Sequence, residues 1–215
     1  MPKADTPPPR TRGYKKKERT RAKLLDAAVE AISTEGASFT ILDVVRAAEV
    51  SNGTFYNYFP DRDALLDAIT LHVLGEFTEV AALLVDVEDA AERFATISAM
   101  LLGQAIVNPQ LATVTLRLEE MQHGKGSEDD PFHYLRLDLE SGAASGRFAN
   151  DVTEAMVDLI VGTLLRTVRR IVSEGASSEH LVEVLMLLLQ TLGLKTREAR
   201  SIATAAIDRL DGGTS

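Results

Sequence analysis

The sequence contains no cysteine and no tryptophan, and aromatic residues make up only 5% of its 215 residues. Without cysteine the chain can form no disulfide bond, no thiolate metal site and no cysteine nucleophile. Long apolar runs are missing too: Val184–Leu189 is far shorter than the roughly 20 residues that a membrane-spanning helix requires. The N-terminus lacks the apolar segment of a signal peptide. We therefore expect a globular, cytoplasmic protein.

Basic residues are in the minority, because 23 lysines and arginines stand against 32 aspartates and glutamates and leave a net charge of −9. Between Arg10 and Lys23, however, eight basic side chains accompany one acidic side chain, so this segment carries eight minus one, or +7. Such a segment attracts polyanions such as nucleic acids, whereas the acidic remainder repels them. Taken alone it also fits a merely solvated arm. We select Lys16, Lys17 and Arg21 as candidate contacts to a polyanion.

Helical spacing dominates the chain, and no stretch shows the sustained period-2 alternation of a β-strand. Leu24, Leu25, Ala28 and Ile32 recur at helical spacing, and the pattern stops at Glu35-Gly36. The predicted helices span residues 16–35, 41–49, 51–59, 62–84, 89–107, 109–121, 131–141, 151–173, 178–193 and 196–210. We therefore predict an all-α protein, preceded by a proline-rich, disordered arm at residues 1–13.

The stretch SNGTFYNYF, residues 51–59, concentrates four aromatic rings in a chain that is otherwise poor in them. Together with the preceding RAAEV it has the layout of a helix-turn-helix. We expect an inward face of Val44, Ala47, Ala48, Val50 and Phe55. We expect an outward face of Ser51, Asn52, Thr54, Tyr56, Asn57 and Tyr58. These uncharged hydrogen-bonding groups suit phosphate oxygens, base edges and thymine methyl groups, so the pattern predicts a DNA-reading surface.

The segment FTILDVVRAAEVSNGTFYNYFPDRDALLDAI resembles the DNA-binding segment of the TetR (tetracycline-repressor-like) family of bacterial transcriptional regulators. The matching residues are Thr40, Ala48, Val50, Ser51, Gly53, Thr54, Tyr56, Tyr58 and Phe59. Arg62 stands where the family usually has a lysine, and the resemblance covers residues 16–69. It implies a helix-turn-helix DNA-binding domain at 14–62 and a helical domain for effector binding and dimerisation at 63–215.

The resemblance also implies a role for each matched position. Backbone phosphates would be bound by Thr40, Tyr56, Tyr58 and Arg62. Base edges in the major groove would be met by Ser51, Asn52, Thr54 and Asn57. Gly53 would let the backbone approach the duplex closely, and Phe55 and Phe59 would belong to the core.

Two positions depart from the family pattern. Glu49 replaces the usual glycine of the turn, so a positive φ there would cost on the order of 1 kcal/mol. Its carboxylate would also place negative charge near the phosphates. Val45 replaces a small alanine and is expected to widen the contact between helices.

Enzymatic and metal-binding functions find little support in the sequence. His123 and His133 flank an acidic, glycine-containing segment, but no histidine pair shows the i, i+4 spacing of metal ligands. No nucleophile elbow, phosphate-binding loop or dinucleotide fingerprint occurs. We therefore predict no enzymatic activity, no metal and no cofactor.

The segment 181–194, LVEVLMLLLQTLGL, is apolar around nearly the whole helix, which predicts burial on all sides. A second copy of the chain would provide the cover, in a four-helix bundle with the preceding helix, as the resemblance also implies. The alternative is that the helix forms the core of a monomer. The predicted dimer interface consists of Met156, Leu159, Ile160, Thr163, Leu181, Leu185, Leu188 and Leu192.

The family resemblance further implies a small-molecule effector bound inside the C-terminal domain. Candidate pocket residues are Phe94, Met100, Gln104, Leu118, Met121, His123, Phe132 and Tyr134, and plain core is the alternative for each. Few charges interrupt them, so we expect a largely apolar ligand. The predicted function is a repressor that binds double-stranded DNA at a pseudo-palindromic operator and is released by this ligand. The alternative is a helical, dimeric interaction protein whose DNA-binding head is degenerate.

Overall fold

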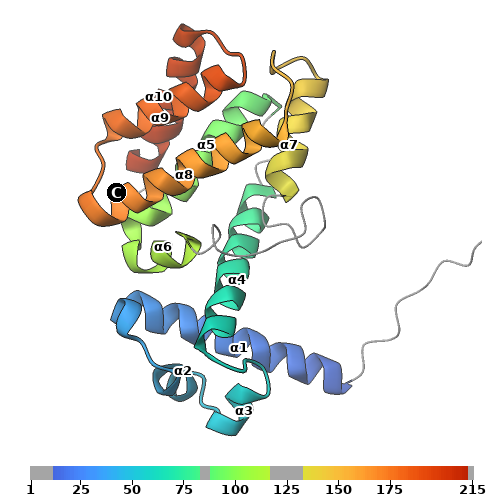
Figure 1. The fold of residues 1–215 in the computed structure, drawn as a ribbon, viewed down its shortest axis with the longest axis vertical. Helices are drawn as coiled ribbons and strands as arrows, with labels where there is room; N and C mark the ends of the chain where they lie inside the picture. Colours follow the sequence, from blue (N-terminus) through green and yellow to red (C-terminus); the bar gives the residue numbers. More distant parts are fainter. Residues whose placement is uncertain (1–11, 83–87, 117–132, 213–215) are drawn as a thin grey trace, which may run out of the picture. The chain divides into compact units, whose positions relative to one another are not determined.

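The computed structural model describes residues 12–82, 88–116 and 133–212, and within these ranges every regular element is a helix (Figure 1). The predicted all-α fold is confirmed. In the described ranges, no helix combines the length and apolarity needed to cross a lipid bilayer. The chain divides into two compact units, residues 1–69 and 70–215, so the division falls beyond the boundary expected after residue 62. Most of the expected arm lies outside the described residues.

The N-terminal unit contains α1 (Arg12–Glu35), a 3-10 turn (Gly36–Ser38), α2 (Ile41–Ala47), α3 (Asn52–Tyr56) and the first turns of α4 (Arg62–Ala82). The apolar stripe expected in α1 is buried, with Leu24 and Ala28 both at 0% exposure. The helix ends where the sequence predicts, because Gly36 adopts a φ of +59°, a conformation that glycine takes readily.

The core of the N-terminal unit is formed by side chains from all of its helices. The buried residues include Leu25, Ile32, Phe39, Val44, Val45, Ala48, Phe55, Phe59, Leu65 and Ile69. One expectation needs correction: Ala47 is exposed. The short helix α2 buries the adjacent positions 44, 45 and 48, which leaves Ala47 on its outer side. The larger Val45 is accommodated at 6% exposure.

The C-terminal unit is built around α5 (Ala90–Val107). This helix contacts α6 (Pro109–Thr115), α7 (His133–Ala144), α8 (Glu154–Glu174), α9 (Ser178–Thr191) and α10 (Thr196–Gly212). Small buried side chains on α5, including Ala91, Ala95 and Ala99, let these neighbours approach closely. Figure 1 shows α8, α9 and α10 gathered around α5.

The breaks between these helices have local chemical causes. Asn108 accepts a hydrogen bond from the backbone N–H of Leu111, and Pro109 occupies the first turn of α6, where its missing N–H costs nothing. Ser177 caps α9 in the same way. After α9, Gly193 has a φ of +99° and lies so close to Ala149 that an added Cβ would stand 2.9 Å from the Ala149 backbone nitrogen. The predicted breaks at positions 108–109, 174–175 and 193 are confirmed.

An ion-pair cluster ties α5 to α10 in the C-terminal unit. Asp89 caps α5 by accepting hydrogen bonds from the N–H groups of Ala91 and Glu92. The Arg147 guanidinium lies 2.8 Å from an Asp89 carboxylate oxygen and 2.9 Å from a carboxylate oxygen of Glu198. Burial raises the pKa of Asp89, but the hydrogen bonds from Arg147 and the two amides outweigh burial, so this pKa lies below its usual value.

Candidate DNA-binding surface and dimer face

The first helix of the helix-turn-helix, α2, is fixed by a reciprocal cap. The Thr40 side chain accepts a hydrogen bond from the Asp43 N–H, while the Thr40 N–H donates to the Asp43 carboxylate at 2.8 Å. The Thr40 hydroxyl also donates to that carboxylate, at 2.6 Å. These bonds from Thr40 lower the pKa of Asp43. Thr40 is exposed, as a phosphate contact requires, but its hydroxyl already serves the cap.

The second helix, α3, begins at its cap residue Ser51. The Ser51 hydroxyl accepts from the Thr54 N–H at 3.1 Å and lies 2.8 Å from the Thr54 hydroxyl. These two predicted base-contacting residues are therefore joined to each other at the start of the helix. Asn52, Gly53 and Asn57 are exposed beside them, as the predicted reading face requires.

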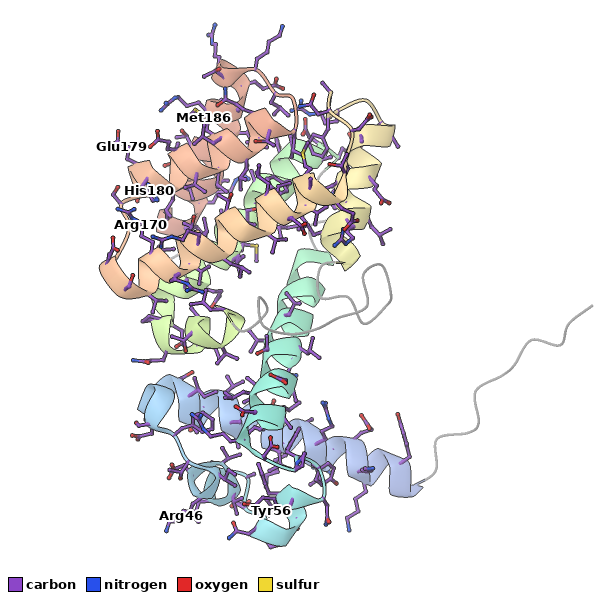
Figure 2. The ribbon with its side chains drawn as sticks, in the orientation of Figure 1. Arg46, Tyr56, Arg170, Glu179, His180 and Met186 are labelled. Atoms are coloured by element: carbon purple, nitrogen blue, oxygen red, sulfur yellow. The ribbon has the colours of Figure 1, made fainter. Side chains whose placement is uncertain are left out.

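The aromatic side chains of SNGTFYNYF divide between core and surface. Phe55 and Phe59 are buried at 0% and 3% exposure, with ring centroids 5.7 Å apart. Tyr56 is 55% exposed and packs edge-on against Phe55, with centroids 5.4 Å apart. Tyr58 is half-buried. The two phenylalanines thus anchor α3, and Tyr56 is presented outward, as Figure 2 shows.

Basic side chains of the N-terminal unit lie partly against aromatic rings. The Arg62 guanidinium stands 4.3 Å from the centroid of the Phe39 ring, and that of Arg21 stands 5.8 Å from the centroid of Phe59. Both distances fit cation–π contacts, which orient the cations. Lys16 and Lys17 are exposed on α1.

Arg46 is a further candidate DNA contact that the sequence alone did not indicate. This residue is exposed in the last turn of α2 and, together with Tyr56, is visible at the end of the unit that carries α2 and α3 (Figure 2). The signal that would have found it is a cation on the outer side of the first helix of the motif, where phosphate contacts commonly arise.

Glu49 adopts the positive φ expected of the family's turn glycine, at +52°. The turn is held by hydrogen bonds from the Glu49 N–H to the Arg46 carbonyl and from the Val50 N–H to the Val45 carbonyl, each 3.1 Å long. The Glu49 carboxylate accepts a hydrogen bond from the Lys23 ammonium, also at 3.1 Å. Its negative charge is therefore paired with a cation of α1.

The predicted pocket residues are only partly described. Phe94 is buried in the core of the C-terminal unit at 2% exposure, and Met100 is half-buried. Gln104 needs correction, because it is exposed on α5 beside exposed Ile106 and does not face the core. Leu118, Met121, His123 and Phe132 lie outside the described residues, as does the side chain of Tyr134. The lining of an effector pocket stays a prediction.

The predicted dimer interface also needs correction. Ile160, Leu181, Leu185, Leu188 and Leu192 are at most 1% exposed within a single chain, so they belong to its core and cannot face a partner. The reason is that α10 and α5 of the same chain cover α9. Leu159, by contrast, is 48% exposed, and Met156 and Thr163 are half-buried.

An open hollow of about 500 Å³ lies along α8 and α9. Its lining is formed by Asp158, Leu159, Gly162, Thr163, Arg166, Thr167, Arg170, His180 and Val184. Arg170 and His180 mark its position in Figure 2. A Cβ added to Gly162 would meet nothing within 4 Å, and Leu187 on α9 is 53% exposed. The outer side of α8 and α9 thus offers apolar side chains and an unfilled depression.

Comparisons with known proteins agree with this geometry. The model of the family "Bacterial regulatory proteins, tetR family" matches residues 24–69. The transcriptional repressor NicS of Pseudomonas putida is 25% identical over 157 residues, which cover 68% of this chain and 74% of NicS. The regulator BetI of Burkholderia thailandensis is 39% identical over 67 residues, or 31% of this chain and 34% of BetI.

Solved structures extend the likeness over nearly the whole chain. The structure of RolR in complex with resorcinol has a TM-score of 0.70 and 26% identity, and the match covers 88% of this chain and 95% of RolR. The fatty acid degradation regulator FadR from Bacillus halodurans shares the fold, with a TM-score of 0.56 and 22% identity. The match covers 90% of this chain and 99% of FadR. With the helix-turn-helix geometry of residues 40–59, these matches show that residues 24–69 carry the DNA-binding segment of the tetR family and that the chain is similar to helix-turn-helix transcriptional regulators.

Proposed function

We propose that the protein is a ligand-responsive transcriptional repressor that binds a pseudo-palindromic operator as a homodimer. The observation that carries this proposal is the outward face of α3, where Asn52, Tyr56 and Asn57 are exposed over an anchor of buried phenylalanines. A helix that only packs would present charges or alanines there. Amide and phenol groups instead match the donors and acceptors on base edges and phosphates.

Affinity and selectivity come from different residues in this proposal. Lys16, Lys17 and Arg21 on α1 supply salt-sensitive attraction to phosphates and position the N-terminal unit on the duplex. The amides of Asn52 and Asn57 carry the sequence selectivity, because they accept and donate toward base edges in the major groove. Thr40, Tyr56, Tyr58 and Arg62 would hold the backbone on either side.

The homodimer is supported by the outer side of α8 and α9. Exposed Leu159 and Leu187 are apolar groups that a second copy would remove from water. The hollow beside Gly162 leaves room for side chains of that copy. Since the same surface would face itself across a twofold axis, the two pairs of helices would form a four-helix bundle.

The effector is proposed to be a small, largely apolar molecule with one or two polar groups. Support comes from the likeness to RolR, whose structure holds resorcinol, a molecule of that description. Release from DNA requires that the effector bind the DNA-incompetent conformation more tightly than the DNA-binding one. A thermal-shift series with resorcinol and other small phenols, followed by operator-binding measurements, tests this step. Stabilisation together with weaker DNA binding is expected, and no effect of any compound would contradict it.

In-vitro selection from random duplex DNA tests the DNA-binding function itself. We expect the purified, effector-free protein to enrich a pseudo-palindrome with half-sites about one helical turn apart or somewhat more. If the folded protein enriches no sequence, the head is degenerate and the alternative of a helical interaction protein holds.

A further inference from the structure

An exposed ion pair joins α1 to the turn of the helix-turn-helix. The Lys23 ammonium lies 3.1 Å from the Glu49 carboxylate, and their side chains are 50% and 82% exposed. Lys23 continues the basic series that runs through Lys16, Lys17 and Arg21 on the same helix. Glu49 therefore pairs with a cation that lies on the same helix as the three residues to which the proposed function assigns phosphate binding, but that is not one of them.

The backbone holds this carboxylate in place. Glu49 has a φ of +52°. Among the residues that the structure describes, all others with a positive φ are glycines. Hydrogen bonds from the Glu49 and Val50 N–H groups close the turn. Glycine would take this conformation without strain, so the strained glutamate points to a use for its side chain.

We propose that Glu49 acts as a built-in competitor of DNA phosphates for Lys23. In the free protein its carboxylate holds the ammonium, and on DNA it keeps Lys23 from adding a phosphate contact. A carboxylate and a phosphate present the same kind of anionic oxygen acceptor to a lysine, so Glu49 occupies the ammonium that a phosphate would otherwise bind. This inference rests on the proposed DNA-binding function.

The consequence falls mainly on DNA that lacks the operator. Binding to such DNA depends on phosphate contacts alone, whereas operator binding also uses base contacts. By withholding one cation, Glu49 lowers the affinity for bulk DNA and limits the amount of protein held away from the operator. The variant Glu49→Gln keeps the size of the side chain and makes the same demand on the backbone at position 49. It removes the negative charge that holds the Lys23 ammonium.

The test is a fluorescence anisotropy titration of the full chain with a labelled duplex of mixed sequence at several salt concentrations. In Glu49→Gln the slope of log affinity against log salt should steepen by about 0.9, the value for one additional phosphate contact. Affinity at low salt should rise several-fold. Lys23→Ala should match the wild type, and the double variant Lys23→Ala/Glu49→Gln should return to the wild-type slope. Glu30→Gln, an exposed acid on α1, removes the same charge and should leave the slope unchanged.

Three outcomes would overturn the inference. The first is an unchanged slope of log affinity against log salt in a Glu49→Gln protein that circular dichroism shows to be folded. It would mean that the ion pair only stabilises the turn. A steeper slope that persists in the double variant would show a general charge effect that does not pass through Lys23. If no folded variant binds any duplex, the DNA-binding function fails and the inference fails with it.

Discussion

At the scale of single residues, the proposed function assigns base reading and phosphate binding to different side chains. Asn57 and Lys17 are both exposed, but only the Asn57 amide can both donate to and accept from a base edge. The two kinds of contact respond differently to salt and to DNA sequence. Comparing one residue of each kind therefore tests the assignment of the surface.

We expect Asn57→Ala to cost about 1–3 kcal/mol of operator affinity and to relax the preference at one base pair, with little change in salt dependence. Lys17→Ala should weaken binding to all duplexes alike and reduce the salt slope by about 1. Anisotropy titrations on the selected operator and on a scrambled duplex measure both effects. Equal losses on both duplexes for Asn57→Ala would remove it from the reading face.

Which aromatic side chains of the N-terminal unit are buried was predictable from the sequence, because the helix-turn-helix motif is short and local. Phe55 is buried and Tyr56 is exposed, as expected from the helix-turn-helix layout, and Phe59 is buried, as the family resemblance implies. The pairing of Lys23 with Glu49 was not predictable, because the two residues are 26 positions apart and their approach depends on how α1 packs against α2. The exposure of Ala47 was not predictable either. In a helix of only seven residues the apolar pattern is too short to show which positions face the core.

At the scale of helices, most helix ends were predictable from capping residues, glycines and a proline in the sequence. The helices against which each one packs were not predictable. The apolar helix α9 was expected to be covered by a second chain, whereas α10 and α5 of the same chain cover it. An apolar pattern predicts that a helix is buried, but it does not identify the neighbour, because burial is non-directional. The proposed dimer face therefore contains the exposed residues Leu159 and Leu187.

This corrected face makes a prediction about association. Leu187→Glu places a charge where a partner is expected, so the dimer should weaken by roughly a hundredfold or more. Leu137→Glu is the matched control, because Leu137 is a similarly exposed leucine on α7, away from the hollow. Light scattering at micromolar concentration measures the mass of each variant. A Leu187→Glu protein that remains dimeric as firmly as the control would place the interface elsewhere.

The charge of Asp89, which caps α5, predicts how the stability of the fold depends on pH. The pKa of Asp89 is lowered below the usual 3.8, so its carboxylate stabilises the fold above that pH, and this contribution is lost as pH falls through the lowered pKa. Wild type should therefore lose stability on acidification below about pH 4. Asp89→Asn should be less stable than wild type at pH 7, and the difference should shrink at pH 3. Urea unfolding at the two pH values measures it. A constant difference would contradict the role of the Asp89 charge.

At the scale of the whole molecule, charge is divided between a basic α1 and an acidic remainder. In the proposed function such a division would keep DNA at the N-terminal unit, because the acidic C-terminal unit would repel phosphates. Two copies joined through α8 and α9 would carry two heads, and each head would meet one half of an operator. The spacing between half-sites is then a property of the dimer, and a single head cannot set it.

The central claim, that a homodimer reads two half-sites at a fixed spacing, is tested most directly by the affinity for the selected palindrome and for a copy with its half-sites moved apart by about five base pairs, half a helical turn. The insertion rotates one half-site to the opposite side of the duplex without changing either sequence. We expect the affinity to fall to that of a duplex with a single half-site. Equal affinity for both spacings would contradict it.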